Sequence, residues 1–276
     1  MTASAGLTPE EESKPYAKYY SMRLSEPDAG LLAQLRPENP IDPEAALAIE
    51  DLDRLLEPGY LPVETGWCVL PNGAGYVAVH TIMPGVTVEM VNWWFAWHGL
   101  EALRYKIWWP KGHLSVSVGD DDRAKILDPN LPLTDKFQGR VHTVVEDVGV
   151  GIQTIDIHFL RPEDMGFDME RFVAPNVGTV VGGFGWASTA GAPPDAPREP
   201  AAMCHFIREV PGGIEFRTRF WLGYTIRERV PVLLVPPGVS VPLEATCGLA
   251  RHNVEEYSNL RVLLPLIYAE QGGVVA

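Results

Sequence analysis

Apolar and polar residues alternate in short runs along most of the chain after residue 65. The runs are rich in β-branched and aromatic residues, and glycine or proline separates them, which is typical of antiparallel strands joined by hairpins. Pro211 and Gly212 form the clearest hairpin turn between two runs. We therefore predict strands in the runs 67–71, 75–83, 113–119, 140–150, 151–160, 179–188, 201–210, 213–226 and 230–236.

Two other stretches have the spacing of a helix. Residues 87–106 repeat large apolar side chains every three or four positions, so a broad aromatic face should pack inward. Residues 248–270 show the same period, and Pro265 is expected to kink or end that helix. The apolar positions are Met90, Trp93, Trp94, Trp97, Leu100 and Leu103 in the first stretch and Leu249, Val254, Leu260 and Leu264 in the second.

Residues 1–65 lack the alternation and hold one helical signal, over 42–56. Asp42 can cap a helix, Pro43 suits its first turn, and the Pro-Gly pair at 58–59 stops it. The helix would carry an apolar stripe that must cover either the rest of the chain or a second copy of it. The stripe consists of Ala46, Ile49, Leu52, Leu55 and Leu56.

These patterns predict an α+β fold in which a curved antiparallel sheet closes over a long C-terminal helix. Such a fold leaves a cavity between sheet and helix, which is the default ligand site. We predict an N-terminal appendage over 1–65, whose apolar stripe would serve oligomerisation if a second copy covers it, followed by the main domain over 66–276. The Pro- and Ala-rich stretch 187–200 is expected to be a mobile surface segment or lid.

Composition narrows the possible partners and the compartment. A net charge of -14 repels phosphate backbones, so nucleic acid is not expected as a partner. No apolar run approaches the ~18 residues that a membrane span needs. The start of the chain is acidic and polar and lacks the pattern of a signal peptide, so we expect a cytoplasmic protein.

Several common sites are missing from the sequence. Cys68, Cys204 and Cys247 are widely spaced without a CxxC pair, so we expect reduced core residues and no cysteine metal site. There is no GxSxG elbow, P-loop, HExxH or GxGxxG between strand and helix. Common nucleotide-binding and serine hydrolase classes are therefore disfavoured.

The most informative local motif is His252-x-x-x-Glu256 in the C-terminal helix. Residues four apart lie on one helix face, so one metal ion could bind both side chains. The alternative is a solvated pair that stabilises the helix by a few tenths of a kcal/mol.

A second His-xxx-Glu pair, His142 and Glu146, lies in a predicted strand, where residues four apart stand about 13 Å apart. These two side chains cannot bind the same ion. Glu146 lies among valines, where a carboxylate should be paired or bound to metal, unless it ends its strand and points to water. His113 begins a strand after an aromatic run, and His205 alternates with apolar residues, so both could face the cavity.

The chain resembles the diacetylphloroglucinol hydrolase and phloretin hydrolase family from about Thr81 to Glu270. The resemblance implies hydrolysis of the C–C bond between an acyl group and a phloroglucinol ring, a START-like helix-grip domain, and a smaller N-terminal segment associated with dimerisation. It rests on the segments NWWFAWHGLEALRYKIWWPKGH, VVEDVG, MCHFIRE, FWLGY and RHNVEEYSNL.

The resemblance also implies roles for individual residues. The family's metal ligands fall on His113, Glu146, His252 and Glu256, with zinc as the expected ion and another divalent metal as the alternative. Tyr105 matches a tyrosine that contacts substrate, and His205 matches the histidine proposed to act on the attacking water. A second family tyrosine should follow the hairpin, where Tyr224 is the available phenol and Phe220 the alternative position.

We therefore predict a metal-dependent hydrolase that converts a small aromatic ketone to a carboxylic acid and a phenol, with no cofactor beyond the metal. The alternatives are a carrier that holds an aromatic or lipid ligand in the same cavity, and a metal enzyme of different chemistry, such as a lactonase or decarboxylase. A homodimer or higher homo-oligomer is expected. The sequence leaves the acyl group open.

Overall fold

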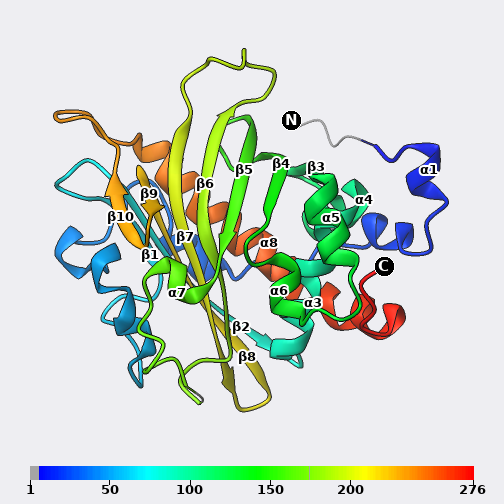
Figure 1. The fold of residues 1–276 in the computed structure, drawn as a ribbon. Helices are drawn as coiled ribbons and strands as arrows, with labels where there is room; N and C mark the ends of the chain where they lie inside the picture. Colours follow the sequence, from blue (N-terminus) through cyan, green and yellow to red (C-terminus); the bar gives the residue numbers. More distant parts are fainter. Residues whose placement is uncertain (1–5, 174) are drawn as a thin grey trace.

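A computed structural model describes residues 6–173 and 175–276, and all nine predicted runs form strands in it. Eight strands make one antiparallel sheet in the order β1-β2-β8-β7-β6-β5-β4-β3, and β9 and β10 form a separate pair (Figure 1). The strands are β1 (Gly66–Val69), β2 (Gly75–Pro84), β3 (His113–Val118), β4 (Val141–Asp147), β5 (Ile152–Leu160), β6 (Thr179–Thr189), β7 (Glu199–Val210), β8 (Gly213–Leu222), β9 (Tyr224–Arg227) and β10 (Val230–Leu233).

Glycines decide where the last strands turn. Gly212, at φ +85°, completes the predicted two-residue turn between β7 and β8. Gly223, at φ +95°, splits the run 213–226 into β8 and β9. Residues after Gly223 therefore leave the large sheet.

The C-terminal helix α8 (Leu243–Gln271) packs against β1, β2 and the helices α3 and α4. It continues through Pro265, so the expectation that this proline could end the helix is wrong. The layered arrangement of sheet and long helix confirms the predicted α+β class (Figure 1).

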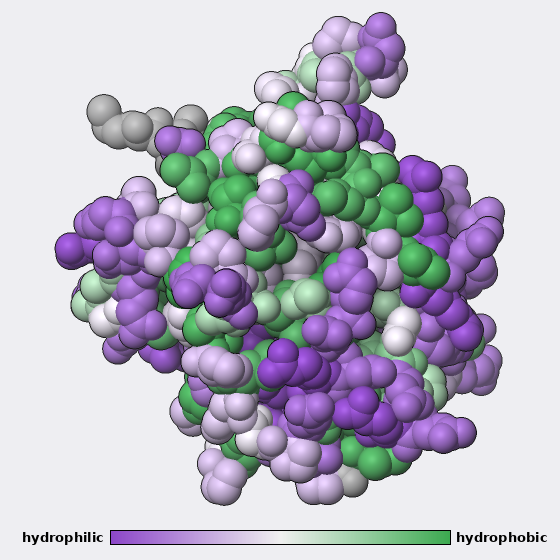
Figure 2. All heavy atoms as spheres, turned by 90° about the vertical axis from the view of Figure 1, so that its left-hand side faces the viewer, coloured by the Kyte–Doolittle hydropathy of each residue, from purple (hydrophilic) through white to green (hydrophobic). Residues whose placement is uncertain are grey.

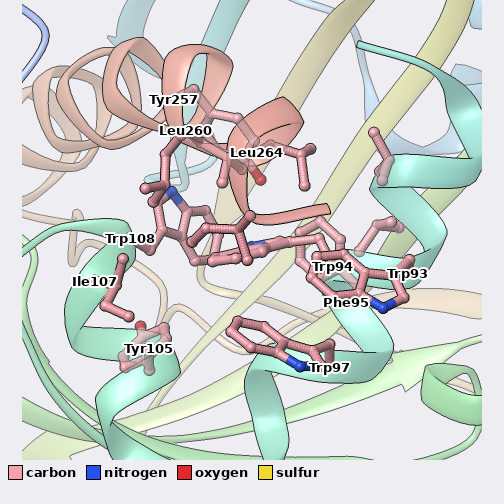
Figure 3. Close-up of a cluster of buried hydrophobic side chains, with 14 of the residues drawn as sticks. Trp93, Trp94, Phe95, Trp97, Tyr105, Ile107, Trp108, Tyr257, Leu260 and Leu264 are labelled. Atoms are coloured by element: carbon pink, nitrogen blue, oxygen red, sulfur yellow. The ribbon is translucent and has the colours of Figure 1, made fainter. Parts of the chain in front are cut away.

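The predicted single helix over 87–106 is broken in the structure. It consists of α3 (Val88–Trp97), a 3-10 turn η4 (His98–Leu100) and α4 (Ala102–Trp108). Gly99 has low helix propensity, and Glu101 has an extended backbone that ends the helical path. The break lets side chains of α3, α4 and α8 converge on one aromatic core that includes Trp93, Trp94, Trp97, Trp108 and Tyr257 (Figure 3).

The predicted helix over 42–56 is also wrong. Two 3-10 segments, η2 (Pro43–Ala45) and η3 (Ile49–Leu56), flank an extended stretch. The carbonyl of Leu47 in that stretch accepts a hydrogen bond from Trp221 Nε1 at 2.8 Å, so a tertiary contact overrides the local helical signal. The remaining helices are α1 (Pro9–Glu12), η1 (Ala17–Ser21), α2 (Ala29–Gln34), α5 (Asp120–Leu127), α6 (Leu133–Phe137) and α7 (Pro162–Met165).

The apolar stripe of η3 is covered by the same chain. Ile49, Leu52, Leu55 and Leu56 are buried in a cluster with Tyr76, Trp221 and other side chains of the sheet. The sequence left open whether the rest of the chain or a second copy covers this stripe, and in the structure the rest of the chain covers it. Oligomerisation through residues 1–65 stays a prediction, and residues 1–5 lie outside the described part.

Other expectations from composition are confirmed in the described residues. All three cysteines are free and buried. Across residues 6–173 and 175–276, the helices lack the combination of length and apolar character that a membrane span requires.

A buried charge cluster fixes the N-terminal segment to the outer face of β8. Glu64 bonds to Arg217 Nη2 and Arg219 Nη2, both at 2.6 Å, and both arginine side chains are almost fully buried. Burial alone would raise the pKa of Glu64, but hydrogen bonds and charge from the two arginines outweigh it and lower that pKa to about 2. The carboxylate is therefore ionised wherever the protein is folded near neutral pH.

Replacement of Glu64 by Gln should lower the free energy of unfolding by about 3–5 kcal/mol, because it leaves two buried guanidinium groups without their counter-charge. The pKa of Glu64 is depressed on folding, so its stabilisation is present above its ordinary pKa of 4.5 and is lost as pH falls through about 2. Urea titrations of both proteins over that pH range measure the difference. E57Q, at an exposed glutamate, is the control and should change stability little; an equal loss in both variants would contradict the cluster's role.

Candidate metal centre

His113 reaches the site through a tight turn after α4. The amides of Gly112 and His113 both donate to the carbonyl of Trp109, which returns the chain onto α4. The imidazole of His113 then stacks on Tyr105, with ring centroids 3.9 Å apart and planes 3° apart. Gly112 is required there, because a Cβ would lie 2.9 Å from Trp109 Cδ1 and 3.0 Å from the carbonyl oxygen of Asp147.

Glu146 lies directly opposite His113 in the pairing of β3 with β4. The register shifts between His113 and Ser115, so Leu114 is an extra residue of the kind that re-aims neighbouring side chains. Alternate residues of β4 are buried, and Glu146 is on the buried side with His142 and Val144. His252 and Glu256 approach from α8, one helical turn apart, and both are buried.

The ligand atoms of these four side chains converge. His113 Nε2 is 3.3 Å from Glu146 Oε2 and 3.4 Å from Glu256 Oε2. His252 Nε2 is 3.9 Å from the same oxygen of Glu146 and 3.8 Å from that of Glu256. Ligands of a tetrahedral ion with bonds of 2.0–2.1 Å lie about 3.3 Å apart, so these separations suit a shared ion.

The ligand atoms of His113, His252 and Glu256 all lie within 4.8 Å of one another. These three residues could hold a metal ion. Glu146 is near both histidines but also accepts a short hydrogen bond from the hydroxyl of Tyr105.

The protonation of His113 fits a metal ligand. Its Nδ1 lies 3.1 Å from the carbonyl oxygen of Tyr105, which can only accept, so Nδ1 carries the proton. Burial lowers the pKa of His113 well below its usual value, and Nε2 of the neutral ring is therefore a bare lone pair. This nitrogen has no hydrogen-bond partner among the described residues and faces two carboxylate oxygens. A cation between them would satisfy all three atoms.

The carboxylates show the same need for positive charge. Burial raises the pKa of Glu146 to about 7, and burial with the nearby charge of Glu146 raises the pKa of Glu256 well above its usual value. Burial lowers the pKa of His252 to about 4, so the histidines supply no compensating charge near neutral pH. Two neutral imidazoles and two carboxylates suit a divalent ion of the zinc type.

The group opens into a cavity of about 490 Å³ between the sheet and α8. The walls are mostly apolar and aromatic, with Phe95 and Trp108 from the aromatic core among them. Val150 and Val239 line it and are about half exposed, so they mark its mouth. On the face shown in Figure 2, apolar side chains gather in the upper half and polar ones cover the lower part. The dimensions suit a small organic ligand.

Tyr105 and His205 both line this cavity. The Nδ1 of His205 is 2.9 Å from Thr218 Oγ1, and burial lowers its pKa to about 3. Phe220 also lines the cavity, with its ring 5.6 Å from that of His205.

The structure does not bring Tyr224 to the site. It follows the break at Gly223, lies in the cluster on the other side of the sheet, and its hydroxyl accepts a hydrogen bond from Asn72 at 2.9 Å. The second family tyrosine is expected after the β7–β8 hairpin. Among the described residues that line the cavity, Phe220 is the aromatic side chain from that part of the chain, and it has no hydroxyl.

Some site residues were not singled out from sequence. Asn253 donates to Glu256 Oε1 at 3.2 Å, and Trp108 Nε1 donates to the carbonyl of Glu256 at 3.2 Å. Asn253 could have been found from its place three positions before Glu256 on the same helix. The contact of Trp108 depends on how α4 packs on α8, which local spacing does not reveal. His98 also lines the cavity, as does His142, which the sequence marks only as the partner of Glu146 in the second His-xxx-Glu pair.

The predicted surface segment 187–200 is partly strand, because β6 ends at Thr189 and β7 begins at Glu199. Arg198 lines the cavity and bonds to Asp156 Oδ2 at 2.7 Å. Lid movement of this segment stays a prediction.

Comparisons with known proteins agree with the motif resemblance. The family model for the DAPG hydrolase PhiG domain matches residues 47–269. Phloretin hydrolase of Eubacterium ramulus is 35% identical over 96% of this chain and 93% of its own length. The 2,4-diacetylphloroglucinol hydrolase of Pseudomonas protegens is 28% identical over 94% of this chain and 85% of its own length.

We predict about one divalent ion per chain in purified protein, and its loss when His252 or Glu256 is replaced by Ala. Elemental analysis after dialysis measures the content. H158A is the matched control, because His158 on β5 stacks on Phe184 and is not in the ligand group. Metal-free protein that binds no added zinc during a chelator-competition titration would contradict the site.

Proposed function

Because the chain belongs to the DAPG hydrolase PhiG domain family, we propose that it hydrolyses the C–C bond between an acyl group and a phloroglucinol-type ring. The observation that carries this proposal is the convergence of two imidazoles and two carboxylates at the wall of an apolar, aromatic cavity. Such a cavity suits an aromatic ring, and the polar group suits its acyl carbonyl.

The reaction adds one water across the bond. Water oxygen attacks the acyl carbonyl carbon of the keto tautomer, the bond to the ring breaks, and its electron pair moves through the ring to the ring ketone oxygen, which takes a proton. The products are a carboxylic acid and a phenol. Ring hydroxyls make this possible, because they allow a keto tautomer in which the leaving ring carbon is already protonated.

We propose His113, Glu146, His252 and Glu256 as the ligand set and zinc as the ion. When bound, such an ion supplies Lewis acidity and lowers the pKa of water toward ~7. The protein's part is to hold the ligands in place. Tyr105 stacks on His113 and bonds to Glu146, Asn253 bonds to Glu256, and the carbonyl of Tyr105 fixes the tautomer of His113.

Tyr105 and His205 are the proposed catalytic side chains. Burial and the neighbouring carboxylate of Glu146 raise the pKa of Tyr105, so its hydroxyl stays protonated. Its single O–H, which donates to Glu146 in the structure, would turn to a developing oxyanion when an ion holds that carboxylate. His205 is neutral at pH 7, and because its Nδ1 contacts Thr218, we assign to Nε2 the contact with the attacking water. Because its pKa is low, His205 is a weak base, so it is better suited to orient the water than to accept and hold the proton of that water.

The alternatives make different use of the cavity. A carrier would have no need of four buried ligand side chains, whose desolvation is costly unless an ion binds them. A metal enzyme of different chemistry remains the second candidate, and product identification separates it from the first. The helix-grip type of the domain and a homodimeric state stay predictions.

The direct test is incubation of zinc-loaded protein with diacetylphloroglucinol, phloretin and a simple acylbenzene. We expect a carboxylic acid and the deacylated ring from the hydroxylated substrates, and no turnover of the acylbenzene, whose ring cannot take the keto form. Chromatography with mass detection identifies both products. Turnover of a lactone panel with none of the acylphloroglucinols would favour the second candidate.

Replacement of His205 by Asn should lower kcat by ~10²–10⁴ while metal content stays that of the wild type. Asn retains a polar atom near the position of Nδ1 for Thr218 and removes Nε2, so folding is spared. Steady-state kinetics and elemental analysis of the same preparation measure both effects. Loss of metal would show that His205 is a ligand, and unchanged kcat would show that it is only a core histidine.

A further inference from the structure

Two buried histidines that the mechanism does not use line the same cavity beyond Tyr105. The ring of His98 lies 5.9 Å from that of Tyr105 and 5.5 Å from that of His142. His98 comes from the turn η4 and His142 from β4, so the break after α3 brings them together. Both side chains are almost fully buried.

His98 presents an acceptor to the cavity. Its Nδ1 lies 2.8 Å from the carbonyl oxygen of Trp94, so Nδ1 carries the proton and donates it. Burial lowers the pKa of His98 to about 4, which keeps the ring neutral near pH 7. Its Nε2 is therefore a lone pair, and no hydrogen bond to it is found among the described residues.

His142 offers both a donor and an acceptor. Neither of its ring nitrogens has a hydrogen-bond partner in the described structure, although the side chain is fully buried. Its ring lies against Gly99, where a Cβ would be 2.4 Å from Cε1 and within 2.9 Å of both nitrogens. The ring of Phe159 also packs against that of His142, edge to face, with ring centroids 4.9 Å apart. Packing thus fixes the imidazole while its polar atoms stay unsatisfied.

Buried polar groups are almost always paired in folded proteins, because an unpaired group keeps the full cost of its desolvation. The two unpaired nitrogens of His142, beside the ring of His98 that lines the same cavity, therefore indicate a ligand. The rings of His113, Tyr105 and His98 follow one another with centroid separations of 3.9 Å and 5.9 Å, so the pair lies close to the metal centre. An aromatic ring whose acyl carbonyl lies at that centre would place a ring substituent near the pair.

We propose that His98 and His142 form a hydroxyl-binding subsite, in which a phenolic O–H of the substrate ring donates to Nε2 of His98 and accepts from an N–H of His142. This inference rests on the proposed function and names its substrate class: rings with a free hydroxyl at the position that reaches the pair. Donation to His98 also increases electron density on the ring, which favours the keto tautomer needed for cleavage.

The test uses metal-loaded protein and two ligands, an acylphloroglucinol and its mono-O-methyl ether. Binding is measured by quenching of tryptophan fluorescence, which does not depend on turnover, and kcat/KM is measured alongside. The wild type should bind the free phenol on the order of tenfold more tightly than the ether. H98N retains a donor for the carbonyl of Trp94 and lacks the acceptor, so this preference should fall to about one.

H142N is the second variant, and H158N is the matched control, because His158 lies outside the residues that line the cavity. Metal content and melting temperature show whether each variant folds. If H142N does not fold, the ligand preference of H98N alone tests the subsite. An unchanged preference in H98N would overturn the subsite even when the protein turns over acylphloroglucinols. A preference that H98N abolishes, in a protein without turnover, would support the subsite and sink the proposed function.

Discussion

The structure depends on two buried carboxyl groups whose pKa values are raised by burial and which have no cationic partner among the described side chains. Glu146 and Glu256 are both buried and both lie within 4 Å of two neutral imidazoles. Each carboxylate would be costly to bury without a counter-charge. The tight turn before His113, the extra residue Leu114 and the packing of α8 on the sheet all act to bring these groups to one point. This convergence supports the proposed cation site, for which His113, His252 and Glu256 could supply ligands.

The two faces of β8 show how the sheet separates structure from chemistry. Thr218 and Phe220 face the cavity side, where Thr218 holds His205 in place. Arg217 and Arg219 face the opposite side, where the segment around Glu64 neutralises them. The arginines on the outer face are paired with Glu64, whereas the carboxyl groups at the cavity lie beside neutral imidazoles. The N-terminal segment thus helps to anchor the strand that positions a proposed catalytic residue.

The sequence predicted the parts of this arrangement that depend on periodicity. The spacing of His252 and Glu256 on a helix and the burial of alternate residues in β4 are local properties, and both appear in the structure. His113 could be assigned only through family resemblance, because its position depends on a turn and a register shift that spacing does not reveal. The failures have the same cause: Leu47 bonds to Trp221, Gly99 packs on His142, and Gly223 turns Tyr224 out of the sheet.

The origin of the ligands in separate parts of the chain has a further consequence. His113, Glu146 and His252 belong to β3, β4 and the distant α8, so an ion bound to all of them is also a cross-link between the sheet edge and the C-terminal helix. Closing such long loops removes conformational entropy from the unfolded chain, as a disulfide does in proteins that have one. Its three cysteines are free, so no disulfide joins distant parts of the described chain. A bound ion would supply such a cross-link, and it would form in the same step that completes the proposed active centre. Catalytic competence and resistance to unfolding would then arise in a single step of maturation.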